Sequence, residues 1–236
     1  LGMPMDSPEA LKMYNELLWT LPAIAGLAGA TLRIPNSFLI AIGGGRNVIF
    51  FSTLLLLIPA AGAGIALQNT GTSYYIFAIL AVLSGFGGGN FASSMSNISF
   101  FFPKRMQGTA LGLNAGLGNL GVSVMQFLIS VVITAGFFGS FAGVGLPLIE
   151  ADGAKVVGTL VFIQNAGWVW VPFLLLSALA AFFGMNNLKT ATPELGNYPA
   201  EFFKIALLNL FGLIAAGTGA YLLTAVKLNM WIVLPV

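Results

Sequence analysis

Charged residues are scarce in this sequence. Asp, Glu, Lys and Arg make up 7% of its 236 residues, whereas soluble domains carry about 25%. Four long runs contain no charged residue at all: 47–103, 106–149, 156–188 and 205–226. A membrane-spanning helix needs roughly 20 apolar residues, and these runs lack the alternation of a membrane β-barrel. The sequence therefore predicts an all-α, polytopic bundle of helices embedded in a lipid bilayer.

Cysteine and histidine are both absent. Without cysteine there is no disulfide and no thiolate metal site. Without histidine the chain lacks the commonest metal ligand and the side chain that titrates near neutral pH. The net charge of +2 is too small and too scattered for nucleic-acid binding. We recognise no nucleophile–base pair and no metal-ligand set, so we predict neither an enzyme nor a cofactor.

The apolar runs predict six spans and the start of another near Met230. The six are expected at about 17–42, 48–67, 74–101, 107–136, 157–184 and 203–226. Residues 1–16 are polar and are expected to form a loop, with Asp6 or Ser7 capping a helix and Pro8 in its first turn. The organisation predicted is a bundle over 1–187, a cytoplasmic linker over 188–202, and a further span with the start of another over 203–236.

Basic residues in short loops predict the orientation, because Lys and Arg stay on the cytoplasmic side. They occur in alternate loops, at 43–47, 102–106 and 185–201. These three loops are therefore expected to be cytoplasmic. The first span then enters from outside, which implies an earlier span that this sequence lacks. The chain reads as a piece of a longer protein.

Arg33 lies inside the first predicted span, in TLRIP. A charge at that depth costs at least about 2.5–3.5 kcal/mol on insertion scales, and such residues usually face a cavity or a partner. No acid lies in any predicted span, so a structural ion pair would need a partner elsewhere. A buried guanidinium without an acid suits a planar oxyanion, which it binds in bidentate fashion.

Small and amide side chains gather in residues 87–121, which contain no acid. At helical spacing they form one face in each of two spans: Gly87, Asn90, Phe91, Ser94 and Asn97, and then Gly108, Gly112, Ala115, Gly116 and Asn119. Small residues let membrane helices approach closely, and packing alone explains most of the glycines. Asn90 and Asn119 are costly in lipid unless they bond something. Each is read either as a packing residue or as a neutral donor to an anion.

The segments that carry these residues resemble the nitrate/nitrite porter family of the major facilitator superfamily. GGGNFASSMSNISFFFPKRMQGTALGLNAGLGNLGVS is closely similar, and ALGLNAGLGNLGVS at 110–123 resembles the family's nitrate signature. TLPAIAGLAGATLRIP at 20–35 resembles the second helix of the family, and GGGRN at 43–47 resembles the loop after it. The resemblance covers about 17–187. It implies the N-terminal half of a major facilitator fold without its first helix, plus an extra span.

The resemblance also implies roles for individual residues. Arg33 would grip the anion, Phe91 would lie against it, and Asn119 would donate a hydrogen bond. Asn90, Asn114 and Gly116 complete the predicted substrate-binding set. A second arginine would come from the C-terminal half, which this chain lacks. The span at 203–226 matches no helix of the family, and one interpretation is a hairpin inserted between the halves.

We therefore expect a secondary transporter of nitrate and nitrite in the cell's inner (plasma) membrane, working by alternating access. The spans offer no Asp, Glu or His for a proton relay, which favours nitrate/nitrite exchange. Two alternatives stay open. One is a major facilitator carrier for another small anion, with or without proton coupling. The other is a membrane sensor or subunit that transports nothing.

Overall fold

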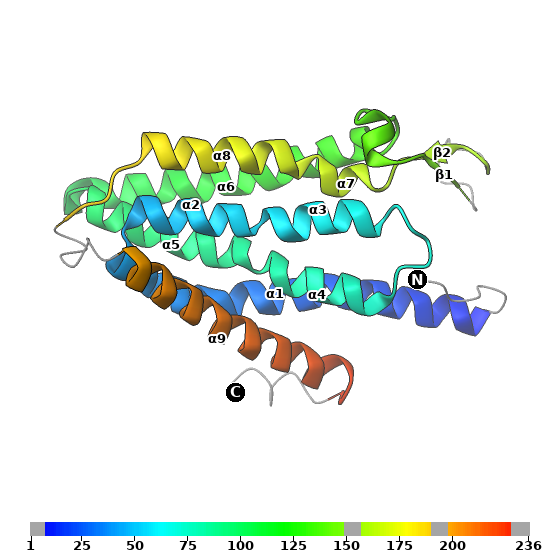
Figure 1. The fold of residues 1–236 in the computed structure, drawn as a ribbon, viewed down its shortest axis with the longest axis horizontal. Coiled ribbons are helices and arrows are strands. Elements are labelled where there is room, and N and C mark those ends of the chain that lie inside the picture. Colours follow the sequence, from blue (N-terminus) through cyan, green and yellow to red (C-terminus); the bar gives the residue numbers. More distant parts are fainter. Residues whose placement is uncertain (1–7, 149–156, 190–197, 228–236) are drawn as a thin grey trace.

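The computed structural model describes residues 8–148, 157–189 and 198–227, which form a bundle of long helices running side by side (Figure 1). The helices are α1 (Pro8–Gly43), α2 (Gly45–Leu55), α3 (Leu57–Ala66), α4 (Tyr74–Ser84), α5 (Phe86–Phe101), α6 (Lys104–Val132), α7 (Asn165–Trp168), α8 (Trp170–Gly184) and α9 (Tyr198–Thr224). A 3-10 turn, η1 (Gly139–Ala142), and a two-stranded hairpin of β1 (Leu146–Pro147) and β2 (Leu160–Val161) lie between α6 and α7.

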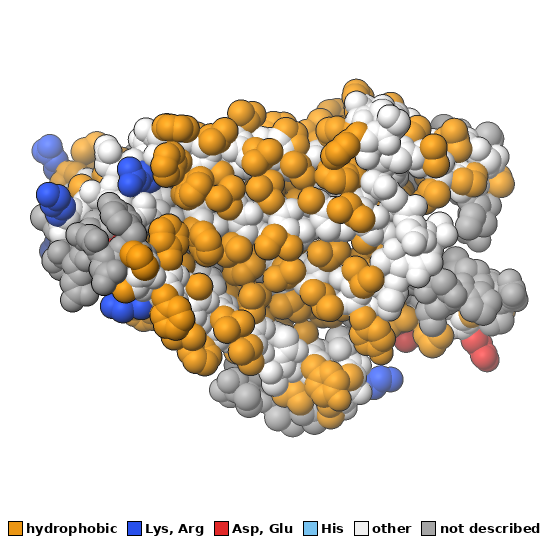
Figure 2. Space-filling model, in the orientation of Figure 1, with side chains coloured by type: hydrophobic (Ala, Val, Ile, Leu, Met, Phe, Trp, Pro, Cys, Tyr) orange, Lys and Arg blue, Asp and Glu red, His pale blue; other side chains and the backbone are white. Residues whose placement is uncertain are grey.

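Six helical stretches among the described residues are long and apolar enough to cross a membrane. They are α1, α2 with α3, α4 with α5, α6, α7 with α8, and α9. Apolar side chains are spread along the whole length of the visible surface (Figure 2). This confirms the prediction of a polytopic helical membrane protein.

The predicted span limits need correction at several ends. Residues 8–16 are helical instead of a loop, because Pro8 begins a helix that continues unbroken to Gly43. Only Gly44, with a φ of +75°, interrupts the helices at 43–47. Residues 157–164 are not part of the fifth span. Instead, β2 pairs with β1 there, and the Phe162 N–H donates to the Ile133 carbonyl at 2.8 Å.

Three of the spans are divided into two helices, and the sequence explains each division. Pro59 and Pro172 have no N–H to donate to the carbonyls of Leu55 and Trp168, so α2 ends before α3 and α7 before α8. Gly85 separates α4 from α5 at a point where α1 comes close. These local breaks leave each span long enough to cross the bilayer.

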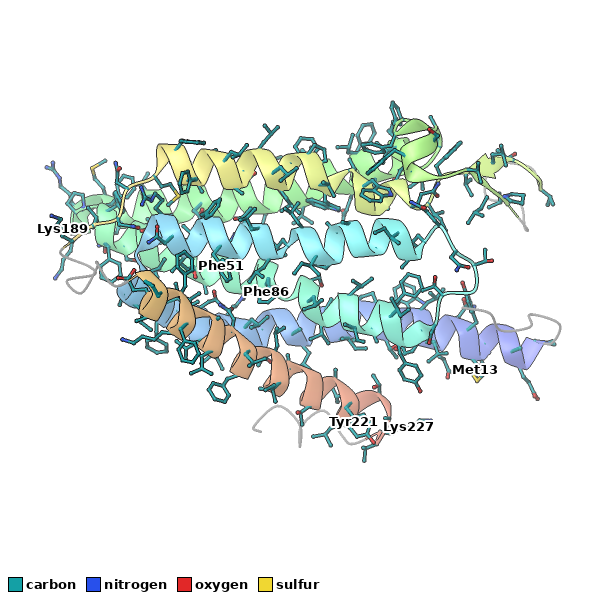
Figure 3. The ribbon with its side chains drawn as sticks, in the orientation of Figure 1. Met13, Phe51, Phe86, Lys189, Tyr221 and Lys227 are labelled. Carbon is teal, nitrogen blue, oxygen red and sulfur yellow. The ribbon has the colours of Figure 1, made fainter. Side chains whose placement is uncertain are left out.

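The basic loops lie at one end of the bundle. Lys and Arg side chains gather at the left of Figure 2, and Lys189 is labelled at the same end in Figure 3. The C-terminal ends of α1, α5 and α8 and the start of α9 meet there (Figure 1). This arrangement agrees with the predicted cytoplasmic side.

Helix α1 lies at the centre of the packing, against α4, α5 and α9. Its crossing with α5 is very close, because a Cβ added at Gly88 would come within 2.5 Å of the Gly29 carbonyl oxygen. Nearer the end that carries the basic loops, α1, α2 and α9 share a buried apolar cluster of Leu39, Ile40, Val48 and Ile205. The position of α1 is therefore fixed on several sides.

Candidate functional site

Arg33 lies in the C-terminal half of α1. It lies ten residues before the end of the helix at Gly43, which corresponds to about 15 Å along the axis. Its side chain is exposed, on a side of α1 that the described helices leave open. No described residue forms a salt bridge with this guanidinium, and the acids of the chain lie outside the predicted spans. The charge is therefore available to an anion.

Phe91 of α5 lies beneath that charge. The Arg33 guanidinium carbon is 5.4 Å from the centroid of the Phe91 ring, a cation–π contact. Such a contact contributes about 0.5–2 kcal/mol, more when it is shielded from water. The contact leaves the guanidinium N–H groups without an acceptor among the described residues, so they can bind a planar oxyanion. The structure thus brings together two of the residues that the sequence predicts for the site.

Asn114 of α6 contacts α5 one turn from Phe91. Its Nδ2 donates to Ser94 Oγ at 3.1 Å and lies 3.2 Å from Met95 Sδ. Ser94 is one turn from Phe91, and its hydroxyl donates to the Phe91 carbonyl at 2.8 Å. Asn114 therefore joins α6 to α5 next to the Arg33–Phe91 pair, with its amide N–H already used inside the protein.

Asn90 contacts a different helix. Its Nδ2 donates to Thr53 Oγ1 of α2 at 3.2 Å, and its Oδ1 is buried without a partner among the described residues. No described contact links it to Arg33. One of its two amide N–H groups is used by Thr53, and its unpartnered Oδ1 is an acceptor, which an anion would avoid. The geometry favours a packing role between α5 and α2 for Asn90.

Gly116 and Asn119 lie on the open face of α6. Both are exposed, and a Cβ added at Gly116 would meet no heavy atom of the described residues within 4 Å. The same holds for Gly108, Gly112, Gly118 and Gly121. No described residue bonds the Asn119 side chain, although its backbone carbonyl accepts from Ser123 Oγ at 3.5 Å. The structure does not bring these two residues to Arg33.

A buried polar cluster beside the site was not anticipated. Asn36, Ser93 and Asn209 are all below 5% exposed, and Asn36 is hydrogen-bonded both to Ser93 of α5 and to Asn209 of α9. The signal was present in the sequence, because an asparagine inside an apolar span is costly in lipid unless it is bonded. The choice of partner depended on α9, which could not be placed from sequence.

Known proteins similar to this chain are named as transporters or antiporters. No family model matches the chain. The nitrate/nitrite transporter NarU of Salmonella typhimurium is 50% identical over 175 residues, which are 74% of this chain and 36% of that protein. NarU of Escherichia coli is 47% identical over 184 residues, 78% of this chain and 38% of that protein. The probable nitrate/nitrite antiporter NarK2 of Thermus thermophilus is 47% identical over 188 residues, 80% of this chain and 41% of that protein. The chain spans about two fifths of the length of these curated relatives.

Proposed function

We propose a transport function from one premise: this chain belongs to the nitrate/nitrite porter family of the major facilitator superfamily. It is a multi-pass protein of the cell's inner (plasma) membrane. The function proposed is secondary transport of nitrate and nitrite by alternating access, as an exchange of one anion for the other. The role is not enzymatic.

The observation that carries the proposal is the Arg33–Phe91 pair. A guanidinium inside a predicted span, 5.4 Å above an aromatic ring and with no described carboxylate in a salt bridge with it, is a site for an anion. Nitrate is planar, and the fork of an arginine binds planar oxyanions through two parallel N–H bonds. In this proposal Arg33 supplies charge and two donors, and Phe91 forms the wall of the pocket.

The other predicted site residues receive narrower roles. Asn119 is proposed to donate to the anion from the open face of α6, where no described residue occupies its amide. Asn114 positions α6 against Ser94. Gly116, which has no side chain, allows another helix to pack closely against that face of α6. Asn90 is proposed to support the site through α2 rather than to touch the anion.

The uncovered face of α6 supports a second half for the pocket. We propose that the C-terminal half of the complete protein covers this face and that the anion binds near the midplane between the halves. Residues 1–187 would form most of the N-terminal half, residues 188–202 a cytoplasmic linker, and 203–236 the beginning of an inserted hairpin. The shorter length of this chain relative to its relatives agrees with such a division.

Exchange is proposed because the predicted spans contain no Asp, Glu or His. Intramembrane acids and histidines carry protons in many coupled transporters. Without them, the return step is best driven by the opposite anion. Stoichiometric acidification of the interior during nitrate uptake would contradict exchange and favour proton symport.

The test is nitrite-driven nitrate counterflow by the complete protein in proteoliposomes. Arg33→Lys keeps the charge but loses the bidentate fork, and a lost hydrogen bond to a charged group costs about 1.5–3 kcal/mol. We expect the kcat/KM for nitrate to fall by roughly 10-fold or more. Arg46→Lys is the matched control, because Arg46 lies at the end of the bundle against Phe182.

Each outcome separates the candidate functions. Counterflow that collapses in Arg33→Lys and persists in Arg46→Lys supports the site. Counterflow unchanged in Arg33→Lys removes Arg33 from it. Flux of another small anion, with poor competition by nitrate and nitrite, would favour a different carrier. No flux of any anion from correctly folded protein would favour a sensor or subunit.

A further inference from the structure

Helix α9 packs closely along α1. One face of α9 is buried, and its residues repeat every three or four positions: Glu201, Ile205, Asn209, Gly212, Ala216 and Ala220. Small residues on this face permit the close approach, since a Cβ added at Gly212 would lie 2.6 Å from Leu32 Cδ2. The opposite face of α9 presents large apolar side chains such as Phe203 and Phe211. The helix therefore has one face for α1 and another for lipid.

A hydrogen bond between two buried amides lies in the middle of this contact. Asn36 Nδ2 of α1 donates to Asn209 Oδ1 of α9 at 3.1 Å, and the two residues are 1% and 4% exposed. The remaining polar atoms are also used: Asn36 Nδ2 reaches the Leu32 carbonyl at 2.9 Å, and Asn209 Nδ2 donates to the Ile205 carbonyl at 3.0 Å. Both amides are thus fixed in one orientation.

Asn36 also bonds the helix on its other side. Ser93 Oγ of α5 donates to the Asn36 backbone carbonyl at 3.0 Å and lies 3.3 Å from Asn36 Oδ1. Gly89 makes room for this amide, because a Cβ there would come within 2.6 Å of Asn36 Nδ2. A continuous chain of hydrogen bonds therefore runs from α9 through α1 to α5.

The chain of hydrogen bonds lies one turn from the candidate anion site. Asn36 follows Arg33 by three residues on α1, and Ser93 follows Phe91 by two on α5. A bond to the backbone carbonyl of Asn36 sets the height and rotation of α1 relative to α5. That height and rotation in turn place the Arg33 guanidinium over the Phe91 ring.

We infer that Asn209 of α9 is a positioning residue for the anion site, acting through Asn36 and Ser93 to hold Arg33 over Phe91. The inference rests on the proposed function. The hydrogen bonds of the Asn209 side chain go to Asn36 and Ile205 and not to Arg33. The helix that carries Asn209 lies outside the segment that resembles the transporter family. Helix α9 then contributes to anion binding by the N-terminal bundle.

The test compares nitrate KM and kcat for three variants of the complete protein in proteoliposomes. Asn209→Leu removes the acceptor. Asn209→Thr keeps an oxygen in a side chain of similar volume, and Leu210→Ala changes the lipid face of the same helix, where Leu210 is 52% exposed. We expect nitrate KM to rise about 3- to 18-fold in Asn209→Leu, the range that one buried interhelical hydrogen bond supplies. We expect partial recovery in Asn209→Thr and no change in Leu210→Ala.

A purely structural role would give a different result. Asn209→Leu would then lower the thermal stability and the yield of folded protein but leave the KM of the folded fraction unchanged, which overturns the inference. If Asn209→Leu does not fold, Asn209→Ala, which also lacks the acceptor, takes its place, and an unchanged nitrate KM in that variant overturns the inference equally. Absence of counterflow in the unsubstituted protein rejects the proposed function itself, so the two failures are distinguishable.

Docking of α9 is tested without transport. The described sequence has no native cysteine, so Gly43→Cys with Ile205→Cys gives a single reactive pair in this part of the protein. A Cβ at Gly43 would lie 3.3 Å from Ile205 Cγ1, and we expect a disulfide to form in the membrane under mild oxidation. Failure to cross-link, with both thiols accessible to a maleimide, would overturn the α1–α9 contact and the inference with it.

Discussion

Helices α5 and α6 are packed very differently. On α5, Gly88 meets Gly29 of α1 so closely that an added Cβ would lie 2.5 Å from a backbone oxygen. On α6, five glycines have no described heavy atom within 4 Å of an added Cβ. Both helices contain several glycines and asparagines. Glycine-rich composition therefore predicts that a helix packs closely against another helix. Only the structure shows which helix that partner is, or that no described helix fills the place.

The largest effect is expected where the packing is closest. Gly88→Ala should force α5 away from α1, because the clash is with backbone that cannot turn aside. We expect a loss of about 3 kcal/mol in the free energy of unfolding, seen as a lower yield of monodisperse protein and a lower Tm in detergent. Gly87→Ala is the matched control, since its Cβ would lie 3.9 Å from Leu56 Cδ2. Equal losses in both variants would contradict the close crossing.

The open side of α6 predicts an effect on transport. If the C-terminal half covers this face, the larger side chain of Gly116→Leu overpacks the interface between the halves. We expect this to cost about 2 kcal/mol, which corresponds to a roughly 30-fold lower kcat/KM for nitrate. The same substitution at Gly184, which also has no described heavy atom within 4 Å, should change transport little. Unchanged transport in Gly116→Leu would mean that this face meets lipid.

A smaller effect is expected between the two regions, at Phe91. Phe91→Leu keeps the apolar wall but removes the ring beneath Arg33. We expect a loss of about 1 kcal/mol, measured as a roughly 5-fold higher KM for nitrate with little change in Tm. Phe91→Tyr, which retains the ring, should preserve most of the affinity. Equal KM values for Leu and Tyr would show that the ring contributes only volume.

The smallest effect tests the packing role of Asn90. Thr53→Val has nearly the same shape but removes the acceptor of the Asn90 amide. We expect a loss of stability of about 0.6 kcal/mol, the average for interhelical hydrogen bonds in a membrane protein. Nitrate KM should not change. A clear rise in KM would place Asn90 in the anion site after all.

Much of the fold could be predicted from the sequence, because charge-free runs and basic loops are direct consequences of a bilayer. The third span was predicted at 74–101, and α4 and α5 together cover the same residues. The prediction of Pro8 in the first turn of a helix is confirmed, whereas the loop expected over residues 8–16 is wrong because that helix runs without a break to Gly43. The hairpin at β1 and β2 was missed because residues 157–164 are as apolar as a span.

The site was predictable only in part. Arg33 is conspicuous as a charge within an apolar span, and its contact with Phe91 follows once α1 and α5 cross. The roles proposed for Arg33, Phe91, Asn90, Asn114, Gly116 and Asn119 stay predictions. The Asn36–Asn209 bond could not be anticipated, because it joins residues 173 positions apart and depends on a helix that no motif placed.

The length of that separation bears on how the protein is made. At synthesis rates of about 5–20 residues per second, Asn209 emerges roughly 9–35 s after Asn36. Ser93, which is 57 positions from Asn36, emerges within about 3–11 s. During the interval Asn36 holds α5 but still lacks its bond to α9. Helix α9 would therefore lock a bundle that has already assembled, and ribosome stalling between the two asparagines should yield an inserted intermediate with Arg33 loosely placed.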